Sequence, residues 1–236
     1  MHARRPAGSG KLTWKTTAQS IFAASFLASC GSLFGESYTY RYRMTVEVDT
    51  PKGLRTGTSV IENTETEGRG IPDNSLHLSR RGQAVLVDLP NGRTLVVTLK
   101  TAGGFDGAFA KAAYNPVLPS HDVPDDWSAR NKALTQLTAP AILPSSAYPM
   151  MVTFRDNRNP TTVEAVDPAN LGRKFGSGYQ LRRIVIQMTN DSVTTGIKTR
   201  FAWLSHLSVF VRRDDQHLWP NNPERNLGKS AFVVGV

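Results

Sequence analysis

Residues 38–48 read YTYRYRMTVEV, and aromatic or aliphatic side chains fill every second position of this stretch. A period of two over that length predicts a β-strand with one buried face and one solvated face. The buried face is expected to carry Tyr38, Tyr40, Tyr42, Met44, Val46 and Val48, and the solvated face Thr39, Arg41, Arg43, Thr45 and Glu47. The turn residues of 49–53 and the alternating segment 57–62 predict a hairpin partner for this strand.

Similar patterns extend through the rest of the chain. A second hairpin is predicted at 84–99 around Pro90-Asn91-Gly92, because Asn-Gly tolerates the positive φ that tight hairpins need. Further strands are expected at 150–154, 179–189 and 207–211, helices at 103–114, 127–138 and 167–176, and a loop at 63–75. Strands joined by hairpins, with helices grouped between them, predict an α+β fold with a mainly antiparallel sheet and a few short helices.

The composition limits the classes of protein to which the chain belongs. Its 236 residues, 39% hydrophobic and 20% charged, suffice for one globular domain and exclude wholesale disorder, collagen-like repeats and a polytopic membrane protein. The single cysteine, Cys30, excludes an internal disulfide and any metal centre with several thiolate ligands.

The first 30 residues have the layout of an export signal. Arg4, Arg5, Lys11 and Lys15 form a basic segment without Asp or Glu, and the apolar run 21–27 and small residues follow. This order is typical of a secretory signal peptide. The remaining 24 basic and 19 acidic residues leave only +5 of the total charge of +9 on the rest of the chain.

Leu27-Ala28-Ser29-Cys30 resembles the lipobox of bacterial lipoproteins. The resemblance implies that Cys30 is the lipidation site: the signal is cut before it, and its sulfur and new amino group carry acyl chains such as palmitate. Each buried methylene contributes about 0.8 kcal/mol to membrane binding, so several chains anchor a domain firmly. Gly31 follows where inner-membrane lipoproteins have Asp, which implies a periplasm-facing anchor in the outer membrane rather than the inner one.

Three other interpretations of this segment remain open: an uncleaved membrane helix over 16–35, a plain secretory signal cut near Ser29, and a cytosolic protein. A helix over 16–35 would be about 30 Å long, enough to cross a bilayer, but hydroxyl and amide side chains shorten its apolar centre. The lipoprotein interpretation divides the chain into a signal segment, 1–29, an anchor with a short linker, 30–37, and a single domain, 38–236.

Several segments of this domain together are similar to an uncharacterised family of small bacterial envelope proteins. They are 40–48, 57–62, 162–168, Phe175-Gly176 and 193–197, and the similarity covers most of residues 38–204. The resemblance implies one coherent domain in the cell envelope, and it implies no activity, cofactor or catalytic residue.

Two histidines lie close to carboxylates in the sequence and are candidates for catalysis or metal binding. His121 lies close to Asp122, Asp125 and Asp126, and His217 follows Asp214 and Asp215. An imidazole beside carboxylates suits general acid-base chemistry or a metal, but short acidic runs near proline are ordinary turn residues. Solvated loops are therefore the expected structure of both.

Glycine and serine motifs are equally uninformative. Ser59 lies in a predicted strand, Gly176-Ser177-Gly178 leads into another strand, and Gly103–Gly107 lacks the lysine of a phosphate-binding loop. No catalytic, cofactor or metal residue is therefore assigned.

The basic residues do not indicate nucleic-acid binding. Tyrosines and arginines that alternate on one strand point to opposite faces, so they cannot stack on bases and bind phosphates together. The expected partners are the membrane, through lipid on Cys30, and another envelope protein or anionic headgroups. The expected function is a binding, structural or assembly role, with an exported hydrolase of unrecognised site and a single-pass membrane-tethered domain as alternatives.

Overall fold

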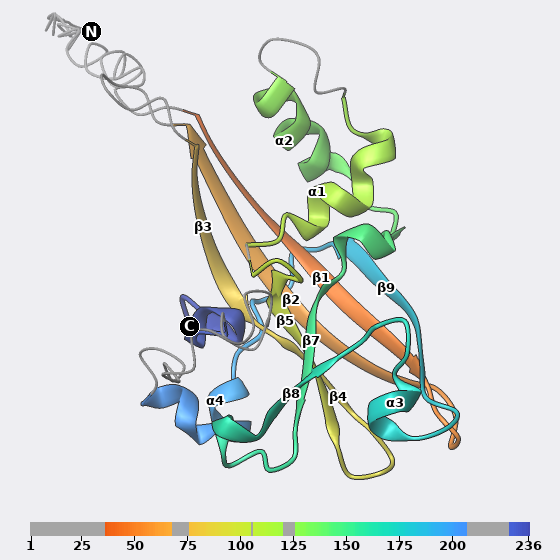
Figure 1. The fold of residues 1–236 in the computed structure, drawn as a ribbon. Coiled ribbons are helices and arrows are strands. Elements are labelled where there is room, and N and C mark those ends of the chain that lie inside the picture. Colours follow the sequence, from red (N-terminus) through yellow and green to blue (C-terminus); the bar gives the residue numbers. More distant parts are fainter. Residues whose placement is uncertain (1–35, 68–75, 105, 120–125, 207–226) are drawn as a thin grey trace, which may run out of the picture. The chain divides into compact units, whose positions relative to one another are not determined.

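The computed structural model describes residues 36–67, 76–104, 106–119, 126–206 and 227–236. The residues in these ranges form one compact unit. Its strands form two antiparallel sheets, and a few short helices lie beside them (Figure 1). The predicted α+β class with a mainly antiparallel sheet is confirmed.

The larger sheet is built around the alternating stretch. Its strands follow the order β10-β3-β2-β1-β9-β6, and each neighbouring pair is antiparallel. Their bounds are β1 Ser37–Asp49, β2 Arg55–Glu67, β3 Leu76–Gln83, β6 Ala141–Ile142, β9 Gln180–Met188 and β10 Val233–Val234. Tyr40, Tyr42, Met44, Val46 and Val48 are buried, as the alternation predicts. The hairpin of β1 and β2 is also confirmed, with Gly53 N–H donating to Thr50 C=O across the turn.

The smaller sheet lies against the inner face of the larger one. It has the order β4-β5-β7-β8, with bounds β4 Val85–Asp88, β5 Thr94–Thr101, β7 Pro149–Phe154 and β8 Val163–Val166. The predicted Asn-Gly turn joins β4 to β5, where Gly92 N–H donates to Leu89 C=O. The sheets approach closely at Gly57, where an added Cβ would lie 2.1 Å from the carbonyl oxygen of Leu86. Only glycine allows this approach.

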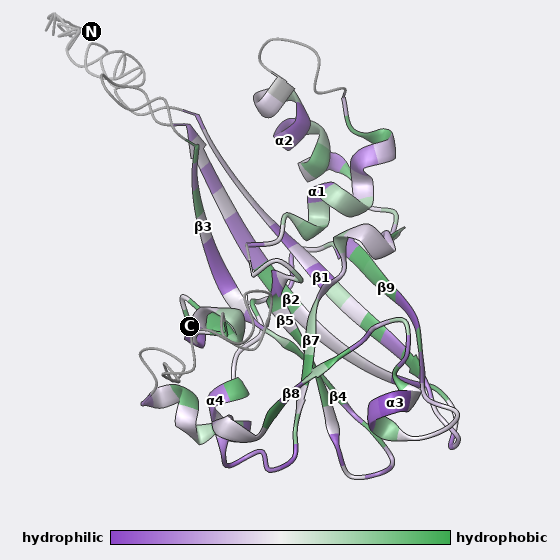
Figure 2. Cartoon of the chain, viewed as in Figure 1, coloured by the Kyte–Doolittle hydropathy of each residue, from purple (hydrophilic) through white to green (hydrophobic). Residues whose placement is uncertain are grey.

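Two apolar clusters hold the layers together. The first fills the space between the sheets and includes Tyr42, Met44, Val97 and Ile186. The second covers the other face of the smaller sheet, where Phe154 packs against Phe201 and Phe232. In Figure 2, β7 is hydrophobic along most of its length whereas β1 is banded, as expected for a strand covered on both faces and one covered on a single face.

The helices are short. The α-helices are α1 Phe109–Tyr114, α2 Asp126–Gln136, α3 Gly172–Phe175 and α4 Ile197–Arg200. The 3₁₀ turns are η1 Asn115–Val117, η2 Ser145–Ala147, η3 Pro160–Thr162, η4 Ala202–Ser205 and η6 Lys229–Ala231. Buried Phe109, Ala110, Tyr114 and Leu134 attach α1 and α2 to the first apolar cluster beside β1 and β9.

Three sequence predictions need correction. The helix expected over 103–114 begins only at Phe109, because the chain first makes a turn in which Gly104 N–H donates to Thr101 C=O. Residues 63–67 were expected in a loop, but β2 continues through them because β1 and β3 pair with them on both sides. The helix expected over 167–176 is reduced to α3, because Asp167 caps a turn at Ala169 N–H instead. The strand expected at 207–211 lies outside the described residues.

Candidate functional site

Most residues that the sequence singled out lie outside the described part of the chain. They are Cys30, His121 and His217 with their neighbouring aspartates 122, 125, 214 and 215. Within the ranges that the structure describes, no group of three or more His, Cys, Asp or Glu is placed to hold a metal ion. Nor is any helix within those ranges both long enough and apolar enough to cross a membrane. Lipidation of Cys30 stays a prediction.

The serine and glycine motifs have structural roles where they are described. Ser59 is buried in β2, and its hydroxyl donates to the carbonyl of Gln83 at 2.8 Å. Gly176 and Gly178 adopt positive φ in the turn that precedes β9. Gly104 N–H closes a turn on Thr101 C=O. These contacts account for the motifs without a bound substrate.

Five arginines of the larger sheet form ion pairs on its outer face. On the outer face Arg41 and Arg81 share Glu62, Arg43 contacts Asp191, and Arg182 and Arg183 bind Asp49 and Glu47. Arg80, by contrast, points inward. Its guanidinium donates to Asn63 Oδ1 and to the carbonyls of Leu99 and Gly107, and it also reaches the Asp106 carboxylate at 3.3 Å. Tyrosines and outer-face arginines thus lie on opposite faces, as predicted.

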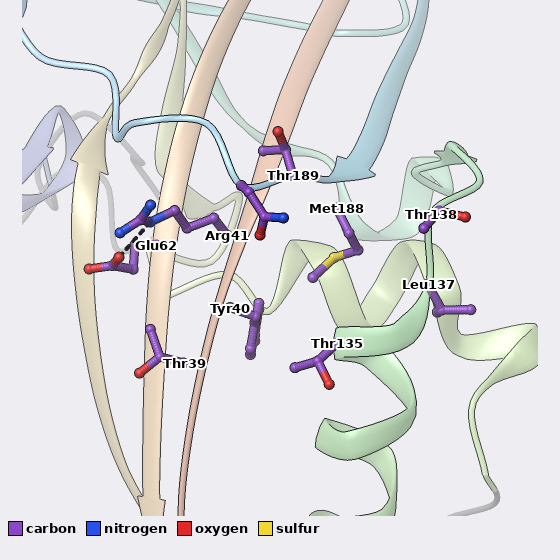
Figure 3. Close-up of a pocket in the computed structure, with 10 residues that line it drawn as sticks. Thr39, Tyr40, Arg41, Glu62, Thr135, Leu137, Thr138, Met188 and Thr189 are labelled. Carbon is purple, nitrogen blue, oxygen red and sulfur yellow. Dashed lines mark hydrogen bonds and ion pairs between the residues drawn. The ribbon is translucent and has the colours of Figure 1, made fainter.

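A hollow of about 360 Å³ lies where β9 ends beside β1 (Figure 3). We call it the edge hollow. Its lining comes from β1 and β2, from the end of α2 and from the residues at and after the end of β9: Thr39, Tyr40, Arg41, Glu62, Thr135, Leu137, Thr138, Met188, Thr189 and Asn190. Its volume lies at the lower end of the range of about 300–1,000 Å³ that small-molecule pockets occupy.

The backbone of β1 borders this hollow. Pairing between β1 and β9 stops at Tyr42 opposite Met188, and Thr189 N–H then donates to the Arg41 carbonyl at 3.0 Å. Because alternate residues of a strand direct their N–H and C=O to opposite edges, Thr39 directs both groups to the same edge as Arg41. That edge faces the hollow.

Below the hollow, a carboxylate is held by four side chains, which we call the Glu65 cluster. Lys111 Nζ lies 2.5 Å and Trp127 Nε1 2.9 Å from Glu65 Oε2. Asn131 donates to the same oxygen at 3.1 Å, and the Tyr40 hydroxyl donates to Oε1 at 2.9 Å. The Glu65 side chain is only 12% exposed. The cluster joins β1, β2, α1 and α2 at one point.

The protonation states of the cluster are fixed by this geometry. Burial alone raises the pKa of Glu65. The hydrogen bond and charge of Lys111, together with the hydrogen bonds from Asn131 and Tyr40, outweigh burial, so the pKa lies below its usual value. Burial raises the pKa of Tyr40 far above its usual value, and the nearby Glu65 charge adds to this effect. Glu65 is therefore a carboxylate and Tyr40 a neutral donor at neutral pH. Both oxygens of Glu65 accept hydrogen bonds within the cluster, so the cluster is better suited to holding the site in place than to catalysis.

Comparisons of the chain with protein-family models, with curated proteins and with solved structures found no match. The edge hollow is therefore a candidate site on the basis of its geometry alone. The sequence did not identify Thr39 or Glu65, because 63–67 is polar on both faces and β9 comes far later in the chain. The alternation of Asn63, Glu65 and Glu67 was the signal that could have extended β2.

Proposed function

We propose that this chain is a lipid-anchored protein of the bacterial envelope, held by acyl chains on Cys30, with a binding or assembly role. The single observation that carries the proposal is the run of residues 27–30, LASC, after a basic and an apolar segment. Sorting to the outer membrane follows from Gly31 by the same family pattern.

The folded unit begins a short distance after Cys30. β1 begins at Ser37, seven residues after Cys30. At about 3.6 Å per residue, a fully extended tether of this length reaches about 25 Å. An anchored chain would therefore keep the first residues of β1 within that distance of the membrane surface. The edge hollow borders the same part of β1, at Thr39.

Expression in a Gram-negative host with labelled palmitate tests the anchor. We expect the wild-type chain to incorporate label, to fractionate with the outer membrane and to begin, by mass spectrometry, at an acylated Cys30. Cys30→Ser should lose the label and the cleavage before residue 30, since both need the thiol. Ser32→Cys on the Cys30→Ser background is the matched control, because it restores a thiol outside the LASC motif.

Three outcomes would overturn the proposal. An intact, unmodified N-terminus in the membrane fraction would indicate a tethering helix. A shortened chain without lipid would indicate a plain secretory signal. An intact chain in the cytosol would exclude export.

A further inference from the structure

We propose that the edge hollow binds an extended segment of a partner protein, which adds to the larger sheet beside β1 in line with β9. The inference names the partner class of the binding role proposed above and rests on that role, but it is independent of the lipid on Cys30. Strand addition of this kind uses backbone hydrogen bonds for affinity and alternate side chains for specificity.

The hydrogen bonds of β1 show which of its residues direct their backbone groups toward the hollow. Arg41 C=O accepts from Thr189 on the β9 edge, whereas Glu36 C=O accepts from Glu67 on the β2 edge. Odd-numbered residues therefore direct their backbone groups to the β9 edge and even-numbered residues to β2. Since β9 ends opposite Tyr42, no residue in the described ranges pairs in the β ladder with Ser37 or Thr39 on that edge.

The described residues that follow β9 turn away from this edge. Asp191 N–H donates to Thr189 Oγ1 at 3.2 Å, and the Asp191 carboxylate contacts Arg43 on the outer face. The chain thus turns outward directly after Thr189, within the turn that this hydrogen bond closes. Thr39 is exposed, and the edge hollow occupies the space that a continued β9 would fill. A short extended segment can take that position and donate to and accept from Thr39.

The walls of the hollow specify the side chains of the segment. A residue opposite Tyr40 points to the inner face, where Leu137, Met188 and the Tyr40 ring line the hollow (Figure 3). A residue opposite Thr39 points to the outer face, where hydroxyls pair across the strands, Thr39 with Thr64 at 2.9 Å and Ser37 with Thr66 at 3.0 Å. Threonine pairs across strands are favourable. The fitting segment therefore alternates small apolar residues with hydroxyl residues.

The direct test is the binding of a fluorescein-labelled acetyl-Thr-Val-Thr-Val-Thr-Lys peptide to the full-length protein in detergent, followed by fluorescence anisotropy. We expect saturable binding with a Kd below about 1 mM. The threonines hydrogen-bond to β1 while the valine N–H groups face away from it. N-methylation of the central threonine should weaken binding about tenfold or more, since it removes a donor and adds a clash. N-methylation of the first valine is the matched control and should leave Kd nearly unchanged.

Protein variants test the same edge from the other side. Thr39→Pro removes the N–H that faces the hollow and leaves the β2 ladder intact, since even-numbered residues form that ladder. It should abolish binding with little change in Tm. Thr39→Val retains the backbone donor and should bind within about threefold of wild type, because only the hydroxyl contact is lost.

No saturable binding of the peptide, or an equal effect of the two N-methylations, would overturn the proposal. The methylated peptides act on wild-type protein, so this result stands even if Thr39→Pro fails to fold. A stable dimer of the full chain that excludes the peptide would also overturn it, since a second copy would then occupy the edge. The Cys30→Ser chain should bind the peptide as wild type does, which separates this test from the test of the anchor.

Discussion

Glu62 and Glu65 lie three residues apart on β2, and their carboxylates point to opposite faces of the same sheet. Their side chains are almost equally covered, at 10% and 12% exposed. Glu62 is covered by Arg41 and Arg81, whose own side chains are 38% and 55% exposed. Glu65 is covered by Lys111, 18% exposed, and by Asn131, which is fully buried. Equal burial thus arises from solvated side chains on one face and from rigid neighbours on the other.

This difference assigns different roles to the two faces. A hydrogen bond from a mobile, exposed arginine competes with water and contributes little net free energy. Donors that come from separate elements are left without a partner when the acceptor is removed, and an unpaired buried charge is costly. The inner face therefore fixes the position of α1 and α2 against β1, while the ion pairs of the outer face contribute little to holding these elements together.

Removing the two carboxylates separately is the strongest test of the comparison. Glu65→Ala leaves Lys111, Trp127 and Asn131 without their shared acceptor, and it should lower the free energy of unfolding by about 3 kcal/mol. Glu62→Ala should lower it by about 1 kcal/mol, because its arginines turn to water. Urea unfolding followed by circular dichroism measures both. Equal losses would contradict the distinction between the faces.

Arg80 and Arg81 repeat the comparison with adjacent arginines. The Arg80 side chain is 5% exposed and the Arg81 side chain 55%. Arg80→Lys cannot reach Asn63, Leu99 and Gly107 at once, so it should cost about 2 kcal/mol of unfolding free energy. Arg81→Lys should change it by less than about 0.5 kcal/mol. Chemical denaturation measures the unfolding free energy of both variants. A larger loss for Arg81→Lys than for Arg80→Lys would contradict the inward position of Arg80.

This pair of arginines also shows what the sequence could and could not reveal. The alternation at 38–48 predicted which face of β1 is buried, because period two depends only on neighbouring residues. The Arg-Arg pair at 80–81 gave no such information, since β3 carries polar residues on both faces. Which arginine points inward depends on its pairing with Asn63, and that register is a tertiary property.

The candidate site was hidden for the same reason. The edge hollow exists because β9 ends opposite Tyr42, and residues about 150 positions apart in the chain meet there. Local patterns predicted both strands but not the point at which their pairing stops. The Glu65 cluster joins β2 to α1 and α2, so no single segment shows it.

Acid unfolding with and without salt sharpens the contrast between the carboxylates. The Arg41 hydrogen bond lowers the pKa of Glu62, and Lys111, Asn131 and Tyr40 lower that of Glu65 against burial, both from the usual 4.5. The unfolded chain therefore takes up protons first as the pH falls below 4.5, and stability present at neutral pH is lost. Glu62→Gln and Glu65→Gln should each make the free energy of unfolding depend less steeply on pH in this range.

Salt distinguishes the two contributions. At about 1 M NaCl the Debye length is about 3 Å, so the exposed pairs of Glu62 are screened while the Glu65 cluster is screened much less. At high salt, Glu62→Gln should no longer change the pH dependence of the unfolding free energy, whereas Glu65→Gln should still reduce it. Stability measured from pH 3 to 6 at both salt concentrations checks this, and equal salt sensitivity would count against the rigid cluster.

The smallest effect is expected for the outer-face pair of Glu47 and Arg183. The pair is bidentate: Arg183 Nε lies 2.9 Å from Glu47 Oε2 and Nη2 lies 3.1 Å from Oε1, and the Arg183 side chain is 47% exposed. A double-mutant cycle with Glu47→Gln and Arg183→Gln should give a coupling free energy of about 0.5 kcal/mol at low salt and almost none at about 1 M NaCl. The matching cycle between Glu65→Gln and Lys111→Met should give a larger coupling that salt barely changes. A coupling at Glu47 as large as that at Glu65 would mean that bidentate geometry alone, without rigid neighbours, stabilises this sheet.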